Sequence, residues 1–273
     1  MGEIRAALAL ARKDVQIVSR YRFSVASQIF TPLYQSVLPA LLFGASFAVG
    51  GRVVGLEKTI GTADLTGFIF LGGVVSGLVA TAFWAMGMSF RQEMENGTLE
   101  PTWLTPTSKE TLVIGRALGG MFWFVFGQAV LFAIGIAFFG LHLRWEMIYA
   151  VPALILASIA LIGVAHLLAG IVLTIRDANL FIDCTNFLFA TASGVAFPIL
   201  LLPGVLQPIA YALPTTYAMD ILRQHALGTR PLMDPLLEYL ALILTTIVMF
   251  PLGRWAFDRA EQRMRVRGTL GQY

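Results

Sequence analysis

Residues 65–100 read LTGFIFLGGVVSGLVATAFWAMGMSFRQEMENGTLE, a long apolar stretch that gives way to a polar segment containing glycine. The stretch Leu65–Ser89 is long enough to cross the roughly 30 Å of hydrocarbon in a bilayer as one helix, because a helix rises about 1.5 Å per residue. The whole chain is 57% hydrophobic and only 13% charged, unlike a soluble domain. The sequence therefore predicts an all-α integral membrane protein.

Five other stretches are apolar over a comparable length, and with Leu65–Ser89 they predict six transmembrane helices. They run over Val25–Val49, Leu112–Phe139, Met147–Leu173, Leu180–Leu202 and Leu236–Leu252. Cys184 lies in the fifth of the six stretches, where we expect a small, buried packing residue.

The distribution of Lys and Arg predicts how the chain crosses the membrane. If both termini are cytoplasmic, only five of the 19 Lys and Arg lie on the outer side: Arg52, Lys58, Arg144, Arg223 and Arg230. This excess on the inner side follows the positive-inside rule, so we expect a multi-pass protein of the cytoplasmic (inner) membrane. Because the basic residues flank the apolar stretches, the net charge of +3 is a signal of topology and indicates no nucleic-acid partner.

Before the first stretch, apolar residues recur at the spacing of an amphipathic helix. They are Ile4, Leu8, Ala11, Val15 and Val18. A helix over Glu3–Arg22 would lie along the inner surface of the membrane, in contact with lipid. A membrane anchor and a docking element for a partner both fit this pattern.

The polar segment after Ser89 contains residues that end one helix and start another. Gly97 can end the first helix in a left-handed turn. Thr98 can then cap a short helix over Leu99–Leu104. Pro106 stops this helix, and Thr107–Glu110 has the spacing of a capping box for the next long helix.

The short helix would present apolar and acidic side chains together. Its apolar residues are Leu99, Trp103 and Leu104, and the acidic residues around them are Glu93, Glu95 and Glu100. Such a surface fits a groove in a soluble partner, with negative charge at its edge. An ordinary capped connector is the alternative.

Between the fifth and sixth stretches, residues 203–232 are too polar to span a membrane. Three prolines divide the segment into short pieces: Pro203, Pro208 and Pro214. Thr215 can cap a helix that ends at Gly228. Asp220 and Arg223 are spaced to pair along that helix. We interpret the segment as an external re-entrant or interfacial helical hairpin that covers the exit of a pathway, with a plain surface loop as the alternative.

Two motifs resemble the signatures of the ABC type-2 exporter permeases, and the likeness covers essentially the whole chain. The first is Glu95-Asn-Gly-Thr-Leu-Glu100 with Thr105-Pro106; the second is Ser193-Gly-Val-Ala-Phe-Pro198, Leu202-Pro203 and Leu213-Pro214-Thr-Thr-Tyr217 with Asp220 and Arg223. The resemblance implies a single transmembrane domain over residues 1–273. Within it, residues 1–22 would form a connecting helix, 23–256 a six-span bundle and 257–273 a basic cytoplasmic tail.

The resemblance also implies the partners of the chain. A half-transporter of this family pairs with a second permease, identical or related, and two copies of a separate ABC ATPase subunit bind beneath the pair. Thr98–Leu104 would be the coupling helix that contacts the ATPase. ATP and Mg would be bound by that subunit, because this chain has no Gly-x-x-x-x-Gly-Lys-Ser/Thr loop, and we expect no cofactor or metal on the chain itself.

Polar residues within the spans are the candidates for a transport pathway: Gln35, Gln128, His166, Asp183 and Asn186. Hydrogen bonds between helices are an alternative role for His166, and an ion pair with Arg176 is one for Asp183. Because the spans carry few charges, we expect a hydrophobic or amphipathic cargo, drug-like or lipid-linked.

Three functions remain open. An ATP-driven exporter of such a cargo leads, and export of a polysaccharide or glycolipid is the alternative within the family. A secondary transporter or channel is an alternative of another class, although no internal repeat is visible in the sequence. The chain has no catalytic constellation, so we do not expect it to be an enzyme.

Overall fold

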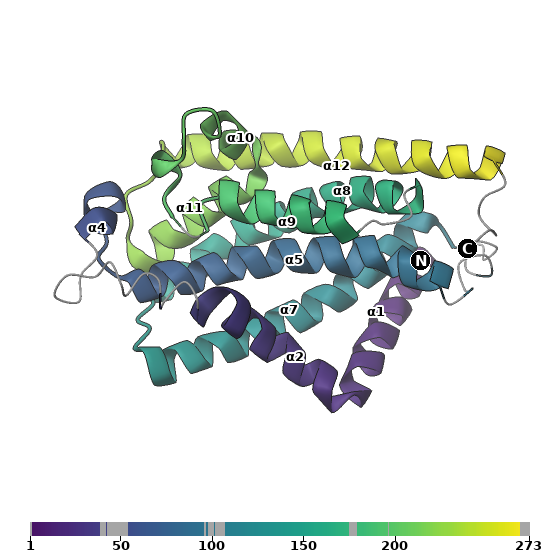
Figure 1. Cartoon of the computed structure of the whole chain (residues 1–273), viewed down its shortest axis with the longest axis horizontal. Coiled ribbons are helices and arrows are strands. Elements are labelled where there is room, and N and C mark those ends of the chain that lie inside the picture. Colours follow the sequence, from purple (N-terminus) through teal and green to yellow (C-terminus); the bar gives the residue numbers. More distant parts are fainter. Residues whose placement is uncertain are drawn as a thin grey trace.

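The computed structural model describes residues 2–38, 42, 54–95, 97, 101, 107–174, 179–195 and 197–267. All regular secondary structure in these residues is helical, which confirms the all-α prediction (Figure 1). The elements are α1 (Gly2–Arg20), α2 (Arg22–Pro32), the π-helix η1 (Leu33–Val37), α4 (Val54–Ile60), α5 (Leu65–Glu95), α7 (Lys109–Phe139), the 3₁₀ helix η2 (Trp145–Ala150), α8 (Val151–Thr174), α9 (Asn179–Ala192), the 3₁₀ helix η3 (Ile199–Leu201), α10 (Gln207–Ala212), α11 (Pro214–Leu227) and α12 (Pro235–Arg267).

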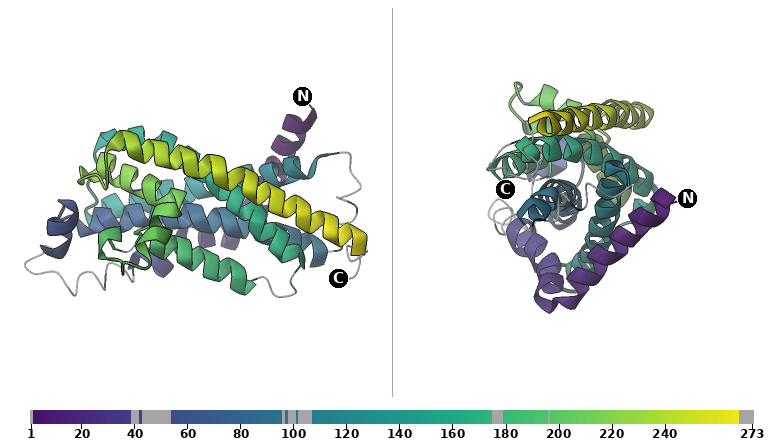
Figure 2. Two further views of the ribbon diagram at one scale, coloured as in Figure 1. Left: turned by 90° about the horizontal axis from the view of Figure 1, so that it is seen from above. Right: turned by 90° about the vertical axis from the view of Figure 1, so that its right-hand side faces the viewer.

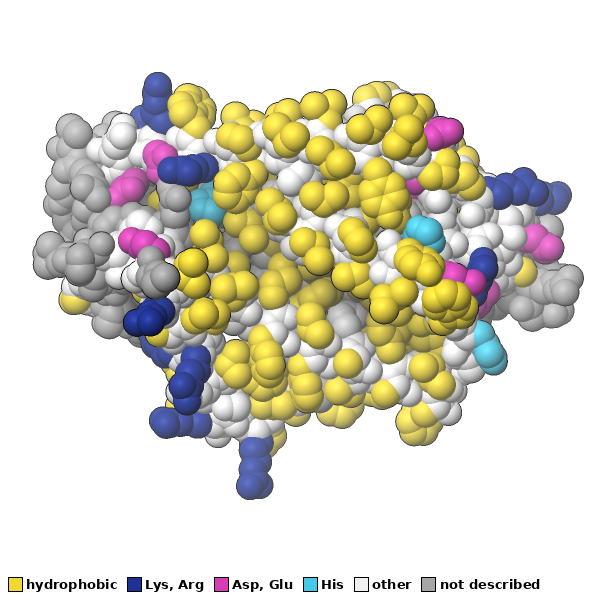
Figure 3. All heavy atoms as spheres, turned by 180° about the vertical axis from the view of Figure 1, so that it is seen from behind, with side chains coloured by type: hydrophobic (Ala, Val, Ile, Leu, Met, Phe, Trp, Pro, Cys, Tyr) yellow, Lys and Arg dark blue, Asp and Glu magenta, His cyan; other side chains and the backbone are white. Residues whose placement is uncertain are grey.

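Four helical segments in the described residues are long and apolar enough to cross a membrane. They are Leu65–Trp84, Ile114–Phe139, Trp145–Val172 and Pro235–Arg263, and they agree with the second, third, fourth and sixth predicted stretches. Figure 3 shows hydrophobic side chains filling the middle of one face, while charged side chains lie toward its two ends. The chain is a multi-pass membrane protein.

The first and fifth predicted stretches differ from these four. Over Val25–Val49, the structure has the end of α2 and then η1, and most of residues 39–53 lie outside the described residues. Over Leu180–Leu202, α9 ends at Ala192 and the chain turns at Gly194, which has φ +76°. The helix is shorter than predicted because this left-handed conformation favours glycine and does not continue a helix. Its 14 residues span about 21 Å.

One face of α9 is exposed rather than packed. Cys184 lies on it, so the prediction that this cysteine is buried is wrong. Phe187 on the same helix is 72% exposed. The apolar composition of the stretch predicted burial, but in this chain it marks a surface that faces lipid or a partner.

The longest helix pairing joins α8 and α12, which run parallel. The contacts recur every seven residues. The Tyr239 hydroxyl donates to the Tyr149 carbonyl oxygen at 3.3 Å, and the Thr246 hydroxyl donates to the Leu156 carbonyl oxygen at 3.3 Å. One heptad further, Gly163 meets Gly253, where a Cβ on Gly163 would lie 2.5 Å from Cα of Phe250. Small residues thus let the two backbones touch, as is common between membrane helices.

The helix α5 is the centre of the bundle. Its large side chains at Phe68, Phe70, Leu71, Leu78 and Phe83 are fully buried. It packs against α7, α8, α9 and α11. The helices α1 and α2 form a V on the side of the bundle opposite α12, and both pack against α7 (Figures 1 and 2).

Candidate functional site

Two ends of the bundle carry the predicted site residues. The start of α1, the end of α5, the start of α7 and the end of α12 lie together at one end, which we call the terminal end (Figure 1). The elements α4, η2, α10 and α11 lie at the opposite end, which we call the far end. The predicted partner-binding loop belongs to the terminal end and the predicted hairpin to the far end.

The loop after α5 is partly described. Glu93 and Glu95 form the last turn of α5, and their side chains lie outside the described residues. Gly97 is exposed with φ +66°, which confirms that glycine allows the chain to leave the helix here. The remaining predicted contact residues of this loop, Thr98, Leu99, Glu100, Trp103, Leu104 and Pro106, lie outside the described residues, so the short helix stays a prediction.

The start of α7 is capped differently from the prediction. The N-cap is Ser108 and not Thr107, and its hydroxyl accepts a hydrogen bond of 3.2 Å from the Thr111 N–H. A carboxylate from another helix completes this cap. Glu3 of α1 accepts from the Ser108 N–H at 3.3 Å and from the hydroxyls of Ser108 and Thr111. This contact could not be predicted, because no local pattern links residues 105 positions apart.

Beyond the Glu3 contact, Gly115 and Gly119 let α7 pack closely against α1. A Cβ on Gly115 would lie 2.9 Å from the Ala7 carbonyl oxygen, and one on Gly119 would lie 3.1 Å from Cβ of Asp14. On the other face of α1, Ile4 is 70% and Leu8 57% exposed. The predicted amphipathic helix is therefore clamped to α7 by one face, and its apolar residues remain available to lipid.

The Glu3 contact gives a testable prediction. Glu3→Ala should speed hydrogen exchange in α1 and in the first turn of α7 while leaving α8 and α12 unchanged. The hydrogen bonds from Thr111 and Ser108 hold the pKa of Glu3 below its ordinary value of 4.5. The contact therefore contributes stability above that value, loses it only as the pH falls through the lowered pKa, and should persist at pH 5.

The control for this prediction is Glu57→Ala, which removes another acidic residue from the first turn of a helix, α4, at the far end. Hydrogen exchange followed by mass spectrometry, with exchange measured at pH 7 and at pH 5, should show the change for Glu3→Ala alone. Equal exchange of α1 in both variants would contradict a clamping role for Glu3.

At the far end, Arg223 joins three elements. Its guanidinium donates hydrogen bonds to the carbonyl oxygens of Gly194 at 2.7 Å, Val195 at 2.9 Å and Phe68 at 3.1 Å. The same group lies 3.3 Å from the centre of the Phe68 ring. Arg223 is only 5% exposed, and burial lowers its pKa, an effect that the charge of Asp220 opposes in part.

The predicted pairing of Asp220 with Arg223 is wrong. Asp220 accepts instead from the Gln224 side chain at 2.8 Å and from the Leu232 N–H at 2.8 Å. Gln224 also donates to Glu238 at 2.6 Å. Arg223 is turned away from this carboxylate cluster toward carbonyl oxygens that need donors. The sequence analysis overlooked Glu238, although an ionisable residue in an apolar stretch was a signal that could have found it.

The cap of α11 is also corrected. The N-cap is Leu213, Pro214 occupies the first turn, and Thr215 is buried with its hydroxyl against that of Ser193. Proline is tolerated at the first position of a helix, because an N–H there would have no acceptor within the helix. The predicted end at Gly228 is confirmed by its φ of +70°.

The other predicted far-end residues shape the same segment. Pro198 precedes η3, Pro203 accepts a turn hydrogen bond of 2.8 Å from the Leu206 N–H, and the Tyr217 hydroxyl donates to the Tyr211 carbonyl at 2.6 Å. The prolines thus set the breaks between η3, α10 and α11, as predicted.

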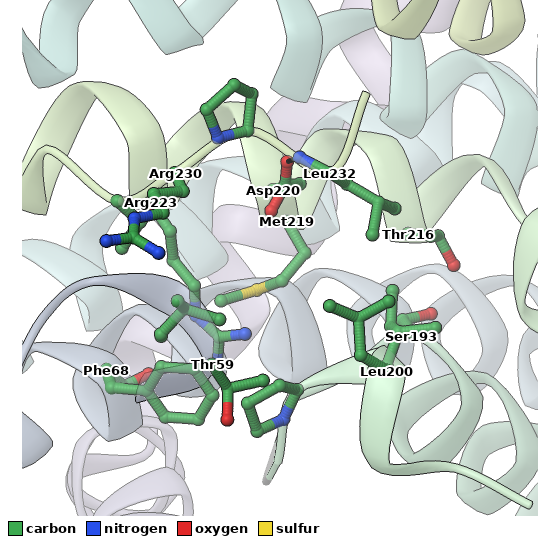
Figure 4. Close-up of a pocket in the computed structure, with 15 residues that line it drawn as sticks. Thr59, Phe68, Ser193, Leu200, Thr216, Met219, Asp220, Arg223, Arg230 and Leu232 are labelled. Atoms are coloured by element: carbon green, nitrogen blue, oxygen red, sulfur yellow. Dashed lines mark hydrogen bonds between the residues drawn. The ribbon is translucent and has the colours of Figure 1, made fainter. Parts of the chain in front are cut away.

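A cavity of about 80 Å³ lies between α4, α5, η3, α11 and residues 229–232 (Figure 4). Its wall includes Asp220, Arg223, Thr229 and Arg230. In Figure 4, Arg223 and Arg230 lie on one side and Ser193 and Leu200 on the other.

The predicted pathway residues lie on four different helical elements. Gln35 lies in η1, and its side chain is outside the described residues. Gln128 on α7 is buried beside Gly77 of α5, and His166 on α8 is buried with Nδ1 2.7 Å from the Ile162 carbonyl oxygen. Asp183 on α9 is exposed.

Asn186, the remaining pathway candidate, lies one turn from Asp183 on α9. The buried oxygen atoms Gln128 Oε1 and Asn186 Oδ1 have no hydrogen-bond partner in the described part of the chain. The described contacts do not bring these residues into one site, so their role in a pathway stays a prediction.

These features define a class of protein: a helical, multi-pass membrane protein with a capped loop at one end and a proline-divided segment at the other. The sequence profile described as ABC-2 type transporter matches residues 5–227. The chain belongs to the ABC-2 type transporter family and is a membrane permease of that type. A search of curated proteins found no match to this chain. Permeases of this family generally work with an ABC ATPase partner.

Proposed function

We propose that the chain is the permease subunit of an ATP-driven exporter that moves a hydrophobic or amphipathic, drug-like or lipid-linked molecule outward across the cytoplasmic membrane. In this proposal two permeases form six spans each, and two copies of a separate ATPase bind beneath them and hold ATP and Mg. The terminal end is cytoplasmic, and the far end with its hairpin over the exit is external.

The arrangement of the terminal end supports this proposal most directly. The start of α7, which follows the loop after α5 in the chain, lies beside the start of α1, where Glu3 accepts hydrogen bonds from Ser108. A force applied to the loop would therefore reach both the interfacial helix and the central bundle. An element that only connected two spans would not need a cap supplied by a third helix.

A double variant tests the proposal: Glu95→Lys with Leu99→Asp. Both changes alter the predicted docking surface without touching the described core, so we expect the bundle to keep its melting temperature. Loss of a central apolar contact and reversal of a charge should reduce the ATPase subunit retained by the tagged permease roughly tenfold or more.

The matched control is Glu57→Lys, a charge reversal at the far end, which should retain the ATPase at the wild-type level. ATP hydrolysis by the reconstituted complex provides a second measurement and should lose its dependence on the permease in the double variant. Normal retention and normal coupling of hydrolysis in the double variant would overturn the proposal.

A further inference from the structure

We propose that the cavity at the far end binds one oxyanion, a phosphate or carboxylate group. This site goes beyond the export function and does not depend on it. Three features of the cavity favour an oxyanion: the charge of its wall, donors that lack partners, and its size.

The wall of the cavity carries an excess of positive charge. Two arginines, Arg223 and Arg230, and one acidic residue, Asp220, are among the residues that line it. Asp220 is already satisfied by Gln224 and Leu232. The hydrogen bonds of the Arg223 guanidinium go to neutral carbonyl oxygens, and no carboxylate of the described residues forms an ion pair with it. A buried charge of this kind is strongly stabilised by a counter-ion.

Two polar atoms of the wall residues lack partners. Arg223 Nε and Thr229 Oγ1 are buried, and neither has a hydrogen-bond partner in the part of the chain that the structure describes. Thr229 is 7% exposed, so bulk water has little access to its hydroxyl. Both atoms belong to residues of the wall and can donate, and an oxyanion is held by donors together with positive charge.

The space and its entrance fit such a group. A buried water needs only about 10–15 Å³ of cavity volume, so a cavity of about 80 Å³ can hold a tetrahedral phosphate or a carboxylate. Arg230 is exposed, and its N–H is held by the Ile60 carbonyl at 2.9 Å, which places it at the rim. A metal ion fits poorly, because Asp220, the one carboxylate among the described residues of the wall, already accepts two hydrogen bonds.

The oxyanion can be free in solution or belong to the headgroup of a lipid. Apolar side chains beside the cavity suit an attached acyl chain, since Leu200 is 53% and Leu201 63% exposed. Both sources share the same recognition chemistry, so the experiment has one arm for each.

The first arm titrates inorganic phosphate into the full chain purified in a neutral detergent, at constant ionic strength with chloride as the reference anion, and follows the melting temperature. The second arm counts phosphatidylglycerol molecules retained by the chain in native mass spectrometry. Arg230→Gln removes the rim charge, Thr229→Val removes the buried donor at nearly constant volume, and Arg144→Gln is a control at the same end, outside the cavity wall.

Arg230→Gln should weaken phosphate binding roughly tenfold, which corresponds to one charge-assisted hydrogen bond, and Thr229→Val should weaken it several-fold. If a lipid fills the site, phosphate has no effect on the wild type, and the wild type retains one phosphatidylglycerol more than Arg230→Gln. Arg144→Gln should match the wild type in both arms. Equal results for the wild type and Arg230→Gln in both arms would overturn the site. Because no ATPase is present, such a failure would leave the export proposal intact.

Discussion

Replacing Gly253 by valine is expected to prevent the bundle from folding. A Cβ at this position would overlap the carbonyl oxygen of Gly163, and a Cβ on Gly163 would in turn press on the backbone of α12. No rotamer change relieves a clash with a backbone atom, so α8 and α12 must separate along their length. We expect a loss of about 3 kcal/mol or more in the free energy of unfolding.

The yield of monodisperse protein in detergent and its melting temperature measure this effect. Gly253→Ala should already be destabilised, because the clash begins at Cβ. The control is Gly204→Val, since a Cβ on Gly204 meets nothing within 4 Å. A Gly253→Val protein that melts with the wild type would show that α8 and α12 do not pack through these glycines.

The sequence was sufficient to predict four of the six expected spans and the turns at isolated glycines. Leu65–Ser89 and the corresponding segments are apolar over the thickness of a bilayer, and this property can be read from each segment alone, without knowing which helices pack against it. Gly97 and Gly228 end helices in left-handed turns, as local conformational preference requires. Gly163 and Gly253 are visible in the sequence of each helix, but neither sequence shows which other helix the glycine contacts.

The contacts between distant segments could not be predicted. Asp220 and Arg223 are three residues apart on one helix, which favours a pair, yet each finds a better partner elsewhere. Arg223 turns to the carbonyl oxygens at the end of α9, which the helix itself leaves without donors. In the same way Ser108, at the cap of α7, donates to Glu3 of another helix. Tertiary contacts overrode local spacing in both cases, because unpaired backbone groups were available.

Replacing Arg223 by methionine is expected to release the far end of α9 from the bundle. Methionine fills much of the same volume but donates no hydrogen bond, so the carbonyl oxygens of Gly194, Val195 and Phe68 lose their shared donor. The Phe68 carbonyl keeps its hydrogen bond within α5, whereas those of Gly194 and Val195 lose a donor at about 1–3 kcal/mol each, so we expect a total loss of about 3 kcal/mol.

Arg223→Lys separates the role of the charge from that of the planar guanidinium. A lysine keeps the charge, but it cannot spread its donors over three carbonyl oxygens while stacking on Phe68. Its stability should therefore lie between those of the wild type and Arg223→Met. If charge alone mattered, Arg223→Lys would be as stable as the wild type.

Denaturant-induced unfolding in detergent micelles measures the order of these variants, and hydrogen exchange at residues 193–195 locates the change. Arg144→Met is the matched control, because its side chain is 54% exposed and forms an ion pair with Glu146 at 3.0 Å, an interaction that contributes under about 1 kcal/mol. A buried arginine that holds three backbone segments should matter far more than an exposed one. If Arg223→Met and Arg144→Met unfold at the same denaturant concentration, Arg223 does not hold the end of α9 in place, and the far end must be held by the packing of α11 against α5 and α8.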